Sequence, residues 1–275
     1  MKIAILAVCF YRYKEILESL DNIISTIVDP SQLTIVAAEM PSPNSDKVKE
    51  SISILKSRHP SVKFHHLLAD ENHISGGLLT ASLSEDGGVS KWMEGCDYIA
   101  VIESDIRLYE KGSVEKCVEY LDKYDYVSYM SPDYEVSDPY HLECKVRWIW
   151  PTPRLNEELL TTGARGFQML VWRMKDWISF CHDVINGVFI ESGKSKCLGG
   201  ILDGNAAKWT NRNRKYIGIA PNIKMLHTGW DVYRPISQDQ EYLDYKNGLE
   251  KSGLLWAGKN TKGNEKINVT EIIHE

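Results

Sequence analysis

The sequence predicts an α/β protein with a mostly parallel central sheet flanked by helices. Two observations lead to this class. Short apolar segments alternate with segments that carry apolar residues at helical spacing through roughly the first hundred residues. The apolar segments are continuous, which is typical of parallel strands covered on both faces. Strands and helices in alternation favour strand–helix–strand units that build one sheet.

Each N-terminal element has its own signal. The first apolar run (IAILAVCF) predicts a buried strand. The helix after it is expected to end at Asp29-Pro30, because the residue before a proline avoids helical geometry. Ser45 is placed to cap the second helix. The expected elements are strands at residues 3–10, 33–38, 62–68 and 98–102 and helices over residues 16–28 and 45–55, with a further helix after Gly76-Gly77.

The second half of the chain is less regular. Its expected elements are helices over residues 114–121 and 177–185, strands at residues 126–130 and 166–172, and one or two short strands within residues 216–226. A polar connection is expected at residues 133–143, and a polar tail with a short helix begins at Gln238. No internal repeat or linker divides the chain, so we expect one domain over residues 1–275.

Composition and cysteine spacing argue against several classes of protein. The formal net charge of −6 over 275 residues disfavours non-specific binding to a phosphate backbone. No window approaches the roughly 20 consecutive apolar residues of a membrane span, and no cleavage site follows the first apolar run. The six cysteines are scattered without a C-x-x-C pair. We therefore expect reduced thiols and a cytoplasmic protein.

Polar side chains follow each of the first four expected strands. They are Arg12, Glu39, Asp70 with Asn72, and Glu103 with Asp105. The carboxyl ends of parallel strands meet at one edge of a sheet, where ligands bind. Two carboxylates two positions apart repel each other unless a cation lies beside them, and Mg²⁺ or Mn²⁺ bound to phosphate oxygens suits such a pair. A solvated turn or a helix cap is the structural alternative.

Six segments in this order resemble the family 2-like glycosyltransferases of the GT-A fold. They are IAILAVCFYR, LTIVAAEMPSPNSD, HHLLADENHISGGLLTASL, CDYIAVIESDI, ILDGNAAKW and IKMLHTGWD. The resemblance implies a GT-A-like (Rossmann-like) domain and transfer of a sugar from a nucleotide-diphosphate donor to a saccharide or other hydroxyl acceptor. It also implies a nucleotide-sugar-binding half (residues 1–110), an acceptor-binding half (111–237) and a C-terminal tail (238–275).

The resemblance assigns roles to individual residues. The family's acidic D-x-D triplet corresponds to Glu103-Ser104-Asp105, with Glu in place of the first Asp. The first residue of that triplet usually meets the ribose and the last usually binds the metal, here Mn²⁺ or Mg²⁺. Glu39 corresponds to the residue after the second strand that holds the nucleobase or ribose. Asp70 and Asn72 correspond to the stretch that brackets the nucleoside.

Three later residues complete the expected site. Asp203 matches the general base of inverting members, although Asp is also favoured at a helix N-cap. His227 matches the late histidine that completes the metal shell, while a lone His in this setting also has an ordinary structural use. Arg165 is expected to steady the leaving diphosphate or, alternatively, to pair with a surface acid.

Three other functions stay open. A nucleotidyltransferase has a related sheet, but it would carry a glycine-rich basic loop that CFYRYKE lacks. A non-catalytic nucleotide-sugar-binding protein would keep the fold without turnover. A phage-type sugar transferase would act on modified DNA bases, and residues 211–215 (NRNRK) supply a compact basic run, for which a solvated loop is the simpler explanation.

Overall fold

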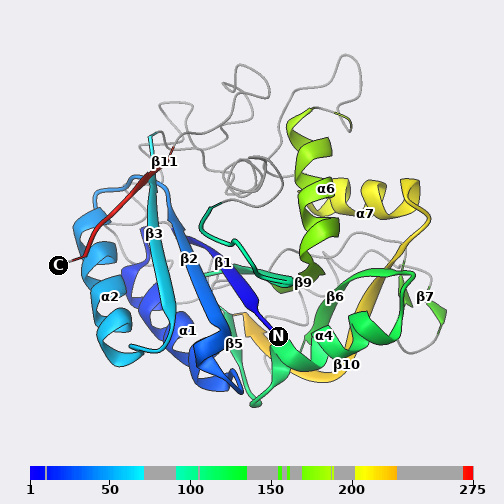
Figure 1. Cartoon of the computed structure of the whole chain (residues 1–275), viewed down its shortest axis with the longest axis horizontal. Helices are drawn as coiled ribbons and strands as arrows, with labels where there is room; N and C mark the ends of the chain where they lie inside the picture. The colour runs from blue at the N-terminus through cyan, green and yellow to red at the C-terminus, as the bar shows by residue number, and fades with distance from the viewer. Residues whose placement is uncertain are drawn as a thin grey trace.

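The computed structural model describes ten stretches of the chain (Figure 1). These stretches are residues 1–9, 11–70, 91–104, 106–134, 154–156, 160–161, 169–186, 188, 202–227 and 269–274. The helices are α1 (Tyr13–Thr26), η1 (Pro30–Gln32), α2 (Ser45–Arg58), α4 (Ser113–Lys123), α6 (Met174–Ile185) and α7 (Leu202–Arg212). The strands are β1 (Ile3–Cys9), β2 (Leu33–Glu39), β3 (Lys63–Ala69), β4 (Tyr98–Glu103), β5 (Ile106–Leu108), β6 (Val127–Tyr134), β7 (Arg154–Asn156), β8 (Leu160–Thr161), β9 (Met169–Arg173), β10 (Tyr216–His227) and β11 (Val269–Glu271).

The described strands form one sheet in the order β11-β3-β2-β1-β4-β9-β6-β10-β8-β7, with β5 paired to β10. The N-terminal strands β3, β2, β1 and β4 are parallel to one another, and β6 is parallel to β10. Antiparallel pairing begins where β9 inserts between β4 and β6, and it recurs at β5, β7, β8 and β11. The predicted α/β class with a central sheet and flanking helices is confirmed.

Both faces of the central strands are buried, which explains the continuous apolar runs. In β1, Ile3, Ile5 and Ala7 belong to the core that includes α1, α2 and α4. Ala4 and Leu6 belong to the opposite core, which includes α6 and α7. Each of these five side chains is at most 3% exposed. Because burial of one Leu or Ile contributes about 1.5–3 kcal/mol, the two layers fix β1 at the centre of the sheet.

The short strand β5 is attached to α1 through Asn22. Asn22 Nδ2 donates to the carbonyl oxygen of Leu108 (3.1 Å), and the Leu108 N–H donates to Asn22 Oδ1 (2.7 Å). β5 pairs with the end of β10 in the register Leu108 opposite Met225 and Ile106 opposite His227. The amide of Asn22 therefore acts as a further strand partner and fixes the chain that follows β4.

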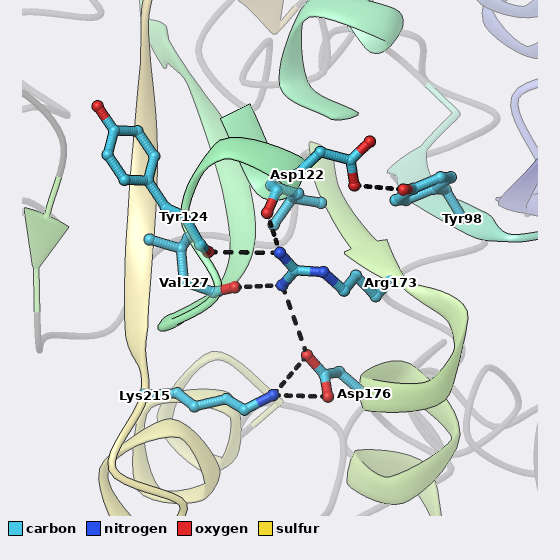
Figure 2. Close-up of polar contacts among 8 residues, drawn as sticks. Tyr98, Asp122, Tyr124, Val127, Arg173, Asp176 and Lys215 are labelled. Carbon is cyan, nitrogen blue, oxygen red and sulfur yellow. Dashed lines mark hydrogen bonds and ion pairs between the residues drawn. The ribbon is translucent and has the colours of Figure 1, made fainter. Parts of the chain in front are cut away.

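Arg173 connects the end of β9 to the chain between α4 and β6 (Figure 2). Its guanidinium donates to the carbonyl oxygens of Leu121, Tyr124 (3.3 Å) and Val127 (2.6 Å). The side chain is 13% exposed and lies 4.0 Å from the carboxylate of Asp176. These bonds connect β9 to the C-terminal end of α4 and to the start of β6.

Four short strands, β5, β7, β8 and β11, were not predicted from the sequence. β10 is a single strand of 12 residues, one of the two outcomes expected for this segment, with irregularities between Tyr216 and Ile217 and between Ala220 and Lys224. β11 was not predicted, because three residues in a polar tail carry no periodic signal and the strand is defined by its pairing with β3. Three segments with a predicted structure lie outside the described residues: the helix after Gly76-Gly77, residues 135–143 and residues 238–268.

None of the helices in the described stretches has the length and apolarity required to cross a bilayer.

Candidate active site

The carboxyl ends of the four parallel strands are level with one another. In the ladder between β1 and β4, Val8 pairs with Glu103, and in the ladder between β1 and β2 the next residue, Cys9, pairs with Glu39. Glu39 in turn pairs with Leu68 of β3. The strand-end carboxylates of β2 and β4 are thus within one residue of the same level, at the edge where α/β folds bind ligands.

Glu39 is buried at this edge. Its side chain is 1% exposed, and Oε2 lies 2.7 Å from Nε2 of His66 on β3. Oε1 is buried and, within the described part of the chain, has no hydrogen-bond partner. Burial, reinforced by the Glu39 carboxylate, raises the pKa of the neighbouring Cys9 thiol, which therefore stays protonated. A buried carboxylate oxygen without a donor is costly, by about 1–3 kcal/mol, and marks a position where a donor from a ligand would be stabilising.

The loop after β1 has a strained backbone. Tyr11 has φ +60° although it is not a glycine, and it is 5% exposed. Its carbonyl oxygen accepts from the Tyr13 N–H (3.0 Å) and from Asn44 Nδ2 (3.1 Å). Asn44, not the predicted Ser45, occupies the N-cap position of α2, and its side chain makes this cross-loop bond instead of a cap. The loops after β1 and β2 are joined next to the strand ends.

The acidic triplet lies where β4 passes into β5. Glu103 is half-buried at the end of β4, and Asp105 lies outside the described residues. Ile106, the residue directly after Asp105, pairs with His227 at the end of β10. The backbone therefore places the residue directly after Asp105 opposite His227, although the two are more than a hundred positions apart in the sequence. The side chain of His227 is outside the description.

The remaining predicted residues are placed less completely. Asp203 is the second residue of α7, so the predicted helical start is confirmed, but its side chain is not described. Asp70 directly follows β3 and is exposed. Asn72 and Arg165 lie outside the described residues. The structure thus leaves the sequence-based roles of these residues as predictions.

Sequence reasoning missed three polar residues around the strand ends. They are the buried Asn44 and His66 and, at the chain terminus, the half-buried His274. A histidine in the strand KFHHLLA carries no motif, and only the pairing of β2 with β3 places it beside Glu39. The pattern HH within an apolar strand was the one available signal, because a His on a buried face requires a polar partner.

The residue types at this edge of the sheet suit a hard divalent cation. Among the described side chains no three His, Cys, Asp or Glu residues gather around one point. The pairing of Ile106, three residues after Glu103, with His227 nevertheless brings carboxylate and imidazole residue types near one another along the backbone. Carboxylate and imidazole together suit Mn²⁺, and carboxylate with phosphate oxygens suits Mg²⁺.

Comparison with solved structures identifies the fold. The mannosyltransferase PcManGT from Pyrobaculum calidifontis, in complex with GDP-Man and Mn²⁺, is similar with a TM-score of 0.54 and 13% identity, over 82% of this chain and 56% of that chain. TarS from S. aureus is similar with a TM-score of 0.51 and 10% identity, over 82% of this chain and 36% of that chain. The chain has a GT-A-like glycosyltransferase fold and spans about half or less of the length of these two proteins. No family model and no curated protein sequence matches it.

Proposed function

We propose that the protein is a metal-dependent glycosyltransferase that moves a sugar from a nucleotide-diphosphate donor to an acceptor hydroxyl. The observation that carries this proposal is the pairing of Ile106 with His227 beside the level strand ends of Glu39 and Glu103. In a GT-A-like fold, this edge of the sheet is where nucleotide and diphosphate would lie. The two similar proteins, one of them in complex with GDP-Man and Mn²⁺, support the same class of reaction.

Each proposed residue has one role. Asp105 and His227 bind Mn²⁺ or Mg²⁺, which neutralises the charge of the donor's diphosphate. Arg165 stabilises the diphosphate as it leaves. The residues proposed to hold the nucleoside are Glu39, Asp70, Asn72 and Glu103. Residues 1–110 and 111–237 form the donor and acceptor halves of this site.

Asp203 is proposed as the general base. Its carboxylate removes the proton from the acceptor hydroxyl while the acceptor oxygen forms a bond to the anomeric carbon. The bond from that carbon to the diphosphate oxygen breaks, and the diphosphate leaves with the electron pair. Direct displacement of this kind inverts the anomeric configuration.

The acceptor is proposed to be a saccharide or a similar small hydroxyl compound. Modified DNA is the second candidate, because residues 211–215 form a basic run. Lys215 in this run places Nζ at 2.7 and 2.8 Å from the two carboxylate oxygens of Asp176, and this ion pair offsets its charge. The overall charge of −6 also opposes binding to a polyanion.

A donor screen tests the proposal. UDP-, GDP- and TDP-sugars are incubated with the wild-type protein and Mn²⁺, and release of nucleotide diphosphate is measured with and without candidate acceptors. We expect turnover of one donor that stops on removal of the metal. Asp203→Asn should retain donor binding and lose transfer by about 10²–10⁴-fold, the contribution typical of a general base. Full transfer by Asp105→Ala would contradict the metal assignment, and failure of every donor to bind would contradict the proposed class.

A further inference from the structure

A chain of hydrogen bonds runs from Glu39 to the C-terminus. His66 Nε2 lies 2.7 Å from Glu39 Oε2, and His66 Nδ1 lies 3.1 Å from His274 Nε2. His274 Nδ1 lies 2.7 Å from the hydroxyl oxygen of Ser53 on α2. The two imidazole rings are stacked, with centroids 5.2 Å apart and planes at 27°. Four residues from four segments thus form one chain that ends on a strand-end carboxylate.

The protonation state of His274 bears on which group donates in each of these hydrogen bonds. Burial, helped by the nearby His66, Lys56 and Lys49, lowers the pKa of His274 from 6.5 to about 4, so the ring is neutral at pH 7. A neutral ring has one N–H and one acceptor nitrogen. If the Ser53 hydroxyl donates to His274, then His274 donates to His66 and His66 donates to Glu39. With this set of tautomers every hydrogen bond from Ser53 to Glu39 is made.

The terminal segment that supplies His274 is firmly docked on β3. Three residues of β11 pair with Leu67, Leu68 and Ala69, and the Ile272 N–H donates to the carbonyl oxygen of His66 (2.7 Å). Glu271 adds a second contact outside the ladder, with Oε1 at 2.5 Å from His65 Nδ1. The segment therefore holds His274 against His66 through backbone bonds that do not depend on the His274 side chain.

Glu39 carries one satisfied and one open oxygen. Oε2 accepts from His66, while Oε1 is buried and has no hydrogen-bond partner within the described part of the chain. A carboxylate with one hydrogen-bonded oxygen has a fixed orientation, and its other oxygen can still accept a hydrogen bond. The anchored oxygen fixes the direction in which the open oxygen can accept a hydrogen bond.

We propose that His66 and His274 are positioning residues of the donor site, which orient the Glu39 carboxylate so that Oε1 accepts a hydrogen bond from the nucleoside of the donor. This inference rests on the proposed function. Through His274 alone, it couples the docking of the C-terminal segment (residues 269–274) to the donor site, and no residue of the segment touches the donor. Because coupling is reciprocal, donor binding also strengthens the docking of this segment.

A purely structural role makes a different prediction. A buried polar chain that only stabilises the fold would, on disruption, lower the amount of folded protein and hence the apparent kcat. A positioning role changes the affinity for the donor and leaves the turnover of bound donor nearly unchanged. The KM of the donor, compared with kcat and with the KM of the acceptor, separates the two roles.

Three variants at the C-terminus provide the test. His274→Ala removes the donor to His66 and keeps β11. His274→Gln keeps an amide N–H that can donate to His66 and an oxygen that can accept from Ser53. Ile273→Ala is the matched control, because the neighbouring Ile273 is 74% exposed. Transfer kinetics are measured with the full-length protein, Mn²⁺ and the donor found in the screen.

We expect His274→Ala to raise the donor KM about tenfold, the effect of one misplaced hydrogen bond. Its kcat and acceptor KM should stay within about twofold of wild type, Ile273→Ala should match wild type, and His274→Gln should recover most of the donor KM. A wild-type donor KM in His274→Ala overturns the inference and leaves the proposed function standing. A wild-type protein that neither binds nor turns over any nucleotide sugar overturns both.

Discussion

Removal of the Asn22 side chain tests how the chain after the acidic triplet is held. Asn22→Ala deletes the two hydrogen bonds of 2.7 and 3.1 Å to the backbone of Leu108. It leaves the N–H and the carbonyl of Leu108 without these partners on a strand of three residues. The same strand pairs Ile106 with His227, so its displacement would also disturb the proposed metal site.

The size of the effect follows from two opposing terms. Each lost hydrogen bond costs about 1 kcal/mol, and the partly buried backbone groups left behind raise the total to about 2–3 kcal/mol. Alanine is a better helix former than asparagine by about 0.6 kcal/mol, which offsets part of the loss because Asn22 lies in α1. The net destabilisation is therefore about 2 kcal/mol, or a decrease in Tm of about 4–8 °C for a domain of this size.

Thermal and urea unfolding measure this change. Ser25→Ala is the matched control, because Ser25 is exposed on the same helix and its hydroxyl donates to the Asp21 carbonyl of that helix. Its effect should lie within about 0.5 kcal/mol of zero. Asn22→Ala should in addition weaken Mn²⁺-dependent donor binding, and Ser25→Ala should not. If the free energy of unfolding of Asn22→Ala lay within about 0.5 kcal/mol of the wild-type value, the reasoning that Asn22 fixes β5 would be refuted.

Two further predictions concern Arg173 and the C-terminal segment. Arg173→Met should cost about 3 kcal/mol of unfolding free energy, because three carbonyl oxygens lose a charged donor (Figure 2). Lys116→Met, which breaks an exposed ion pair, should unfold like wild type, and equal effects of the two variants would contradict this account. Acid should detach the C-terminal segment: the pKa of His274 is lowered from 6.5 to about 4, so docking is fully stable above pH 6.5 and weakens as the pH falls toward 4. Hydrogen bonding to His65 lowers the pKa of Glu271, which acts in the same direction. Amide exchange in residues 269–274, corrected for the intrinsic rate, is the measurement. A constant exchange rate between pH 7 and pH 4.5 would contradict this prediction.

The sequence predicts the fold better than it predicts the contacts at the site. Continuous apolar runs such as residues 3–10 reveal strands buried on both faces, because the signal lies in consecutive residues. The pairing of β11 with β3 and the bond from His66 to Glu39 join residues far apart in the chain, and no local pattern encodes them. Likewise, φ +60° at Tyr11 arises from its contacts and not from its residue type.

The sequence predicts which strand ends contribute residues to the candidate site. Glu39 and Glu103 come where buried runs stop, so their common level follows from a parallel sheet. The burial of Glu39 to 1% exposure was not predictable, because it depends on His66 and on the packing of the neighbouring strands. The opposition of Ile106 and His227 was not predictable, because it depends on the register of β5 against β10.

The affinity of the protein for Mn²⁺ in the presence of a nucleotide diphosphate tests the central claim most directly. Titration followed by electron paramagnetic resonance compares wild type with Asp105→Asn, His227→Gln and the double variant. If both residues hold one cation, each single change lowers the affinity at least about tenfold and the double variant loses less than the sum of the two free-energy changes. Unchanged Mn²⁺ affinity in both single variants would contradict a metal held between the acidic triplet and the end of β10.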